Sequence, residues 1–335
     1  MLRVEDNGEL LALVPLYRKS VHKIFHYRGL YFIGDGSGDA DYLDIIIRPD
    51  REELVVRSLV QFLIKHQDQW DLLFLNEVPE TSLGGKLLQQ ALREVGCYWQ
   101  QTESPCTYVT LPTSWAEYLK YLKPRMRTKV RSLMGQLEQS FPVRFDYCRR
   151  VEDLAPRLAS LFDLHGRRWR TKGEAGVFIS PEKQKFYREM SELFLTRGWL
   201  RLYSLAVDNH YIAHQYCFEY RDTIFLLQEG FDPEWEQYGV GNVLRAYVFR
   251  DCIERQIAVY DFLGGVTPHK LSWGGVVKKS LRNVIGLPTV KNRIFFEIPK
   301  AVALGKERLK TILPEPMLTW VRALNTRKSS FFDRM

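Results

Sequence analysis

The chain has 335 residues, of which 45% are hydrophobic, 13% aromatic and 26% charged, and its net charge is +8. This length allows two domains, and aromatic and branched apolar residues spread along the chain exclude a largely disordered protein. No apolar run reaches the roughly 18 residues of a membrane span. Polar residues such as Arg3 and Glu5 argue against a signal peptide. Five cysteines without a C-x-x-C pair argue against a disulfide framework or a zinc ribbon and favour a reducing compartment.

The first 75 residues predict a β-hairpin, a further strand, a helix and a closing strand. The dipeptide Asn7-Gly8 favours the positive φ angles of a tight hairpin turn. In chain order, the predicted segments are the hairpin strands 2–4 and 9–16, the strand 42–47, the helix 51–66 and the closing strand 71–75.

The same order of elements returns about two hundred residues later. The segments are the hairpin strands 200–207 and 211–218, the strand 223–228, the helix 241–255 and the closing strand 259–263. A strand (143–147) and two amphipathic helices (about 151–169 and 181–197) come before this second hairpin, and nothing comparable comes before the first. The sequence therefore predicts two tandem copies of one α/β unit, either with a shortened first copy or with a start downstream of the natural one.

Basic residues gather between and after the two copies. The helical connector 114–139 carries Lys123, Arg125, Arg127, Lys129 and Arg131 without an acid before Glu138, and the tail has a basic stretch at 300–310. We expect the run 123–131 to be a solvated helix face, or alternatively to guide an anionic acceptor, a membrane surface or tRNA. The predicted divisions are a first unit (1–112), the connector (113–140), a second unit (141–287) and a tail (288–335).

The strongest local motif is Gln237-Tyr238-Gly239-Val240-Gly241-Asn242, directly before the predicted helix. Its two glycines allow a turn with exposed N–H groups, and the helix N-terminus adds partial positive charge, so the loop can cradle a pyrophosphate. The alternative is a helix entry that needs glycine φ angles. The position of the loop 237–242 between a strand and a helix favours an anion-binding site.

Three further motifs complete a resemblance to the GNAT superfamily: His165-Gly166-Arg167-Arg168-Trp169, Gly230-Phe231-Asp232-Pro233 and Asp261-Phe262-Leu263-Gly264-Gly265. The chain resembles the paired-GNAT branch that includes CelD-type cellulose-biosynthesis proteins and Fem-type peptidyltransferases, over roughly residues 9 to 285. The resemblance implies an α/β (α+β) fold of two GNAT-like units, each a mixed, mostly antiparallel sheet flanked by helices. It also implies that the second unit holds the donor and acceptor sites. CelD-like members are taken to be acyl-CoA-dependent N-acyltransferases, and Fem-type members use charged tRNA.

The chain departs from the family pattern at two places. The family has Gln or Arg three residues before the first glycine of the donor loop, where this chain has Glu236, whose charge would repel a pyrophosphate. The family often has Tyr-Lys after the closing strand, where this chain has His269-Lys270, so Lys270 matches and His269 does not.

Candidate catalytic residues come from the central strands of the second copy. His214 has a suitable ordinary pKa for a base, but it and Gln215 point to opposite faces of a strand, so only one of them can face the cleft. Asp261, on an apolar strand, should need a partner, and Lys270 is the candidate. A buried, satisfied histidine and a plain ion pair are the structural alternatives.

Acceptor binding is assigned to His165, Arg168, Trp169, Gln215 and Glu229, and Glu219 and Glu229 are alternative bases. The resemblance implies acetyl-CoA or another acyl-CoA as co-substrate, bound on residues 237–242, and no metal. The predicted function is N-acyl transfer by direct attack of an amine of a small molecule, glycan or peptide. The rival hypotheses are a Fem-type tRNA-dependent transferase and a non-catalytic accessory protein of polysaccharide or envelope biosynthesis. The predicted location is the cytoplasm, either free or at the inner membrane face.

Overall fold

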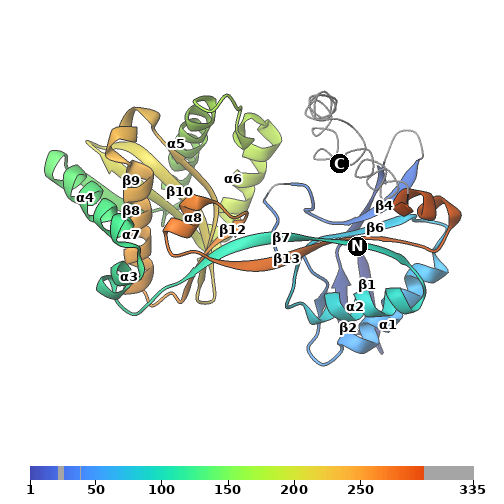
Figure 1. Cartoon of the computed structure of the whole chain (residues 1–335). Helices are drawn as coiled ribbons and strands as arrows, with labels where there is room; N and C mark the ends of the chain where they lie inside the picture. Colours follow the sequence, from blue (N-terminus) through green and yellow to red (C-terminus); the bar gives the residue numbers. More distant parts are fainter. Residues whose placement is uncertain (22–25, 38, 298–335) are drawn as a thin grey trace, which may run out of the picture. The chain divides into compact units, whose positions relative to one another are not determined.

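The computed structural model describes residues 1–21, 26–37 and 39–297. These form two compact units, the first made of residues 1–103 and 281–297 and the second of residues 104–280. The chain passes between them in β7 (Tyr98–Thr110) and β13 (Val276–Gly286) (Figure 1). The expected divisions after residues 112, 140 and 287 stay predictions, and the tail stretch 300–310 lies outside the described residues.

The first unit combines a small and a larger group of strands with helices. β1 (Leu2–Asp6), β2 (Glu9–Val14) and β5 (Ile46–Ile47) form a three-stranded sheet. β3 (Leu16–Val21), β4 (Tyr27–Phe32) and β6 (Leu72–Pro79) lie next to one another in that order. Helices α1 (Glu52–Lys65) and α2 (Leu83–Glu94) contribute Val56, Leu59 and Leu88 to the main core of this unit. The predicted hairpin is confirmed, since Asn7 and Gly8 have φ angles of 50° and 82°.

The strand predicted over 42–47 is wrong in extent. Only Ile46 and Ile47 form a strand, and Tyr42 has a φ angle of 57°, outside the extended region. The strand that pairs in parallel with β6 is β4, which the sequence analysis missed. Ile45, directly before this short strand, packs into the core, so burial rather than strand pairing explains its apolar side chain.

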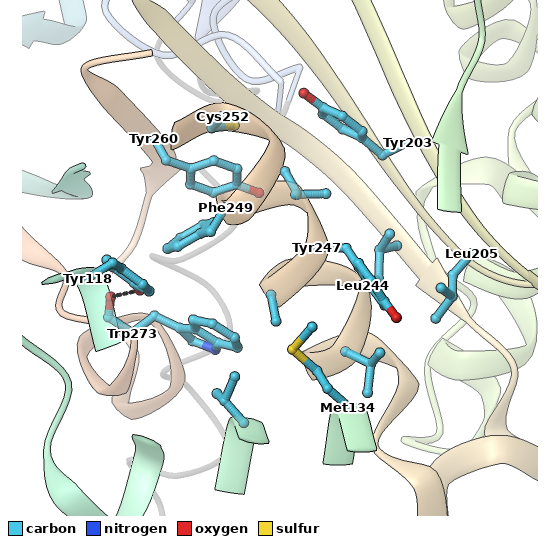
Figure 2. Close-up of a cluster of buried hydrophobic side chains, with 14 of the residues drawn as sticks. Tyr118, Met134, Tyr203, Leu205, Leu244, Tyr247, Phe249, Cys252, Tyr260 and Trp273 are labelled. Carbon is cyan, nitrogen blue, oxygen red and sulfur yellow. Dashed lines mark hydrogen bonds between the residues drawn. The ribbon is translucent and has the colours of Figure 1, made fainter. Parts of the chain in front are cut away.

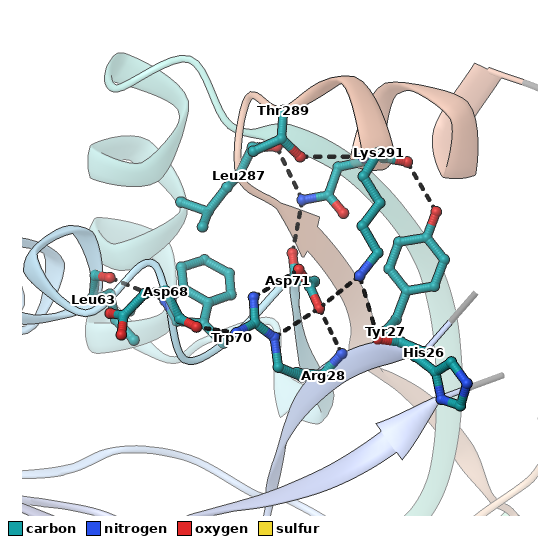
Figure 3. A network of polar contacts seen from close by, with 11 residues as sticks. His26, Tyr27, Arg28, Leu63, Asp68, Trp70, Asp71, Leu287, Thr289 and Lys291 are labelled. Carbon is teal, nitrogen blue, oxygen red and sulfur yellow. Dashed lines mark hydrogen bonds and ion pairs between the residues drawn. The ribbon is translucent and has the colours of Figure 1, made fainter. Parts of the chain in front are cut away.

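Asp71, directly before β6, joins three segments of the first unit. Its carboxylate accepts hydrogen bonds from the Arg28 backbone N–H (2.7 Å) and guanidinium (3.0 and 3.1 Å), and from Lys291 Nζ (3.1 Å) (Figure 3). Asn292 Nδ2 donates to the Asp71 carbonyl over 2.8 Å. Burial alone would raise the pKa of Asp71, but the bonds from Arg28 and Lys291 outweigh it and lower the pKa from 3.8 to about 2.

This lowered pKa predicts a pH-dependent contribution to stability. A carboxylate with a lower pKa in the folded state stabilises the protein above pH 3.8, and this stability is lost as the pH falls through about 2. Asp71→Asn should therefore cost about 2 kcal/mol of unfolding free energy at pH 7, and the difference from wild type should shrink below pH 4. Urea titrations between pH 2 and pH 7 measure it. Exposed Asp68, changed to Asn, is the control, and an equally large pH-dependent loss there would contradict the prediction.

The second unit is a mixed, mostly antiparallel sheet covered by helices on both faces. Its strand order is β7-β12-β11-β10-β9-β8, and only the β11–β12 pair is parallel. The strands are β8 (Val143–Tyr147), β9 (Leu200–Val207), β10 (His210–Tyr220), β11 (Thr223–Phe231) and β12 (Val259–Gly264). The hairpin β9–β10, β11 and β12 were expected, and the predicted fold class is confirmed.

Alternate residues of β9 and β10 divide between the two helical layers. Tyr203, Leu205 and Cys217 pack with α3 (Trp115–Tyr121), α4 (Pro124–Ser140) and α7 (Val240–Glu254). Leu202 and Tyr216 pack with α5 (Val151–Arg170) and α6 (Pro181–Thr196). The basic helix α4 is thus part of this unit, because Met126, Val130, Met134 and Leu137 on its other face are buried.

An aromatic core lies between α7 and the sheet (Figure 2). Phe249 of α7 contacts Tyr118, Tyr260 and Trp273, with ring centroids 4.6–5.3 Å apart. Tyr118 Oη donates to the Trp273 carbonyl over 2.7 Å, which ties α3 to the turn after α8 (Pro268–Ser272). This core fixes α7 and α8, which both line the site described below.

Candidate functional site

The parallel strands of the second unit pair over only a short stretch. β11 and β12 are in register over Thr223–Phe225 and Val259–Asp261, and β11 then continues to Phe231. A pocket of about 390 Å³ lies along this continuation, within the roughly 300–1,000 Å³ of small-molecule sites. Residues of α4, α5, β11, α7 and α8 line it, together with the loop before α7.

The glycine loop forms one wall of this pocket. The 3₁₀-helix η2 (Pro233–Tyr238) ends at Gly239, whose φ angle of 59° turns the chain into α7 without a side-chain cap. A Cβ on Gly239 would lie 2.7 Å from Leu133, and one on Gly241 would lie 3.1 Å from the ring of Phe231. Close packing and a left-handed turn therefore both require glycine here.

The structure brings five of the six predicted loop residues to the pocket: Gln237, Gly239, Val240, Gly241 and Asn242. Tyr238 instead packs edge-on against Phe141, with ring centroids 5.2 Å apart. Glu236 also lines the pocket, so the unfavourable carboxylate noted in the sequence lies at the site.

Glu229 lies between two arginines in the pocket lining. Arg168 Nη1 is 3.0 Å from Glu229 Oε1, and Arg245 Nη2 contacts Oε2. Burial alone would raise the pKa of Glu229, but Arg245 and Arg168 outweigh it and lower the pKa to about 2. The carboxylate is therefore charged at neutral pH, and Lys129 adds a third cation to the lining.

Comparisons with known proteins agree with this geometry. Residues 124–271 match the model of the acetyltransferase (GNAT) domain, and this segment contains every residue that lines the pocket. This segment is a GNAT domain. The predicted membership of the GNAT superfamily is confirmed, and the match supports acyl transfer as the general reaction class. A search of curated protein sequences gives no match.

Solved structures share the fold at low sequence identity. A crystal structure of FemX matches with a TM-score of 0.60 and 12% identity, over 88% of this chain and 89% of that chain. The structure of L-PGS from Bacillus licheniformis matches with a TM-score of 0.53 and 11% identity, over 89% and 85%. A conserved protein of unknown function from Bacteroides thetaiotaomicron matches with a TM-score of 0.50 and 12% identity, over 83% and 85%. These likenesses show the fold.

Gln215, rather than His214, lies on the pocket side of the GNAT-domain sheet. Gln215 is directly opposite Glu229 across the β10–β11 pair, with Nε2 at 3.5 Å from the carboxylate. Tyr260 Oη donates to Gln215 Oε1 over 2.9 Å. Gln215 thus contacts the Glu229 carboxylate from the neighbouring strand.

His214 lies on the opposite face, under α5. Its side chain is fully buried, with Nδ1 at 2.9 Å from Ser204 Oγ and Nε2 at 3.0 Å from Ser160 Oγ. Burial and, secondarily, Arg157 lower its pKa to about 3. It is absent from the pocket lining, so the structure places this predicted base away from the site.

Asp261 and Lys270 both shape the end of β12. Asp261 is buried, pairs with Lys278 Nζ at 2.7 Å and accepts from the Leu263 N–H at 2.8 Å. Lys270 Nζ donates to the carbonyls of residues 262–265. Lys278 was not expected as a partner of Asp261, and the expected pairing of Asp261 with Lys270 stays a prediction. Neither Asp261 nor Lys270 lines the pocket.

His165 and Trp169 lie beside the pocket lining rather than in it. His165 Nδ1 is 3.0 Å from the Glu229 carbonyl and its Nε2 accepts from the Val177 N–H at 3.4 Å. Trp169 lies 5.8 Å from the His165 ring. Of the predicted acceptor residues, Arg168 and Glu229 line the GNAT-domain pocket, whereas His165, Trp169 and Gln215 do not.

Sequence reasoning missed Arg245 and gave His269 no role. Arg245 is 2% exposed, and its guanidinium stands over the rings of Phe262 (5.0 Å) and Trp273 (5.9 Å). The available signal was the position of Arg245 between the apolar residues Leu244 and Ala246 of α7, because a buried charge needs a partner and often marks a site. Within the described residues, no group of three or more His, Cys, Asp or Glu could hold a metal. None of the helices described is long and apolar enough to cross a membrane.

Proposed function

We propose that this chain is an N-acyltransferase that moves an acyl group from acyl-CoA, acetyl-CoA in the simplest case, to an amine. The observation that carries the proposal is the pocket at the N-terminus of α7. Its glycine loop presents backbone at a helix end without a side-chain cap, and Lys129, Arg168 and Arg245 outnumber the two carboxylates of the lining. A helix N-terminus with flanking cations favours an anionic donor such as a pyrophosphate.

Direct attack of the amine on the thioester is the proposed route. All five cysteines lie in the described part of the chain, and none forms a disulfide. Burial raises the pKa of the thiols of Cys148, Cys217 and Cys252, which disfavours a thiolate nucleophile. These properties support a ternary complex and a cytoplasmic location, either free or at the inner membrane face. We propose a small-molecule, glycan or peptide amine of polysaccharide or envelope biosynthesis as the acceptor.

Gly241→Asp tests the donor site. Wild-type protein should bind acetyl-CoA in a calorimetric titration, and Gly241→Asp should weaken binding at least tenfold. The new carboxylate would repel the pyrophosphate, and its Cβ would lie 3.1 Å from Phe231. Gly135→Asp is the matched control, since a Cβ at this α4 position has no atom within 4 Å. Failure of the wild-type chain to bind any acyl-CoA would refute the donor assignment.

The basic face of α4 favours a second candidate, transfer from charged tRNA. Lys123, Arg125, Lys129 and Arg131 are exposed, whereas Arg127 donates to the carbonyls of Lys120 and Leu122. Salt-sensitive tRNA binding that is lost in Arg125→Gln/Lys129→Gln/Arg131→Gln would support this alternative. A folded chain that binds neither acyl-CoA nor tRNA would instead indicate a non-catalytic accessory protein.

A further inference from the structure

One histidine of the pocket has its protonation state set by a buried arginine. His269 lies on the short helix α8 and lines the pocket, and its contact with Arg245 is partly buried. Its Nε2 is 3.0 Å from Arg245 Nη1. A guanidinium has only donors, so Nε2 must accept this hydrogen bond and cannot carry a proton. The imidazole is therefore neutral, with its single proton on Nδ1.

Arg245 cannot easily give up this contact. It is almost fully buried, bound to Glu229, and held over the rings of Phe262 and Trp273. Protonating Nε2 would place two donors against each other beside this fixed cation. Burial, and then Arg245, Arg168 and Lys129, lower the pKa of His269 to about 4, while Glu229 partly opposes them. The cations of α4, α5 and α7 thus agree with the hydrogen-bond geometry, and they outweigh Glu229 of β11.

The backbone around His269 is also fixed. Thr267 Oγ1 caps α8 by accepting from the Lys270 N–H at 3.2 Å, and Lys270 Nζ binds the carbonyls of residues 262–265. Trp273, four residues after His269, is fully buried in the aromatic core. Among the described residues, no hydrogen bond to His269 Nδ1 is present. A positioned N–H donor is thus left for a ligand of the pocket.

We propose that His269 is a catalytic residue whose neutral Nδ1–H donates a hydrogen bond to the carbonyl oxygen of the acyl group during transfer. This inference rests on the proposed acyltransferase function. The amine lone pair forms the new C–N bond, and the thioester oxygen becomes an oxyanion that Nδ1–H stabilises. The carbonyl then re-forms as the C–S bond breaks, with its electron pair on the thiolate. One proton of the attacking nitrogen passes to the thiolate, which gives an amide and free CoA. His269 keeps its proton throughout, as a neutral imidazole acting as electrophile does.

Histidine NMR tests the assignment without an acceptor. In ¹⁵N-labelled protein at pH 7, the signal that is missing from His269→Leu should show a protonated Nδ1 and an unprotonated Nε2. Added acetyl-CoA should move that Nδ1–H resonance. A protonated Nε2, or acetyl-CoA binding without any movement of the resonance, would overturn the inference alone. Absence of acetyl-CoA binding would instead refute the proposed function.

Turnover gives the second measurement, with acetyl-CoA as donor, hydroxylamine as the amine probe and thiol release as the readout. His269→Leu should lower kcat about 10²–10³-fold, the usual loss for one oxyanion donor, with an unchanged Kd for acetyl-CoA. His269→Asn keeps an amide N–H near the position of Nδ1 and should stay within about tenfold of wild type. His210→Leu, an exposed histidine of β10, is the control. Wild-type kcat in His269→Leu, or an equal loss in His269→Asn, would contradict the proposed role.

Discussion

Replacing Glu229 with leucine is expected to lower the unfolding free energy of the second unit by about 3–5 kcal/mol at pH 7. The carboxylate binds both Arg168 and Arg245, and Arg245 is 2% exposed. Its removal leaves a buried guanidinium without its counter-ion, which costs more than the ion pair contributes. Denaturant titration followed by tryptophan fluorescence measures the loss.

The pH dependence separates a loss of charge from a loss of packing. The pKa of Glu229 is lowered from 4.5 to about 2, so its stabilisation is present above pH 4.5 and is lost as the pH falls through about 2. The difference between wild type and Glu229→Leu should therefore shrink in acid. The double variant Glu229→Leu/Arg245→Met removes both charges and should recover much of the stability but not the catalytic activity. A double variant less stable than Glu229→Leu would show that packing, rather than the unbalanced charge, explains the loss.

Local patterns were enough to predict much of the fold. Alternating apolar residues and Asn7-Gly8 predicted the first hairpin. The helix predicted over about 181–197 is α6, which begins at Pro181 with Ser180 Oγ accepting from the Lys183 N–H. The strand over 42–47 failed because an apolar run does not show whether its residues pair with a neighbouring strand or simply pack. That choice is made by tertiary contacts, here the burial of Ile45.

The site was predictable where one segment forms it and not where several do. The glycine loop could be identified because its turn and helix end are encoded in six consecutive residues. The partners of Glu229 come from α5 and α7, far apart in the sequence, so no local pattern joins them. Strand alternation required His214 and Gln215 to face opposite ways, but the packing of α5 decides which of them faces the pocket.

Trp273→Ala is the second substitution with a large expected effect, a loss of about 3–5 kcal/mol of unfolding free energy in the same unit. Trp273 is fully buried, contacts the ring of Phe249 at 5.3 Å and lies 5.9 Å from the Arg245 guanidinium. Truncation opens a cavity that the surrounding helices cannot fill without moving. Tyr118 bonds the Trp273 carbonyl, so this hydrogen bond does not depend on the side chain.

The same truncation should also weaken acyl transfer in protein that is still folded. Arg245 would lose one of its two aromatic neighbours, and His269 depends on Arg245 for its proton position. Trp273→Phe keeps a ring in the core and should lose less of both properties, while Tyr121→Ala, at a side chain 74% exposed, should change stability by no more than about 0.5 kcal/mol. Chemical denaturation and thiol-release kinetics at low temperature report the two effects separately. Full activity in folded Trp273→Ala would show that Phe262 and Glu229 alone hold Arg245, so that the aromatic core stabilises the unit without positioning its charged site.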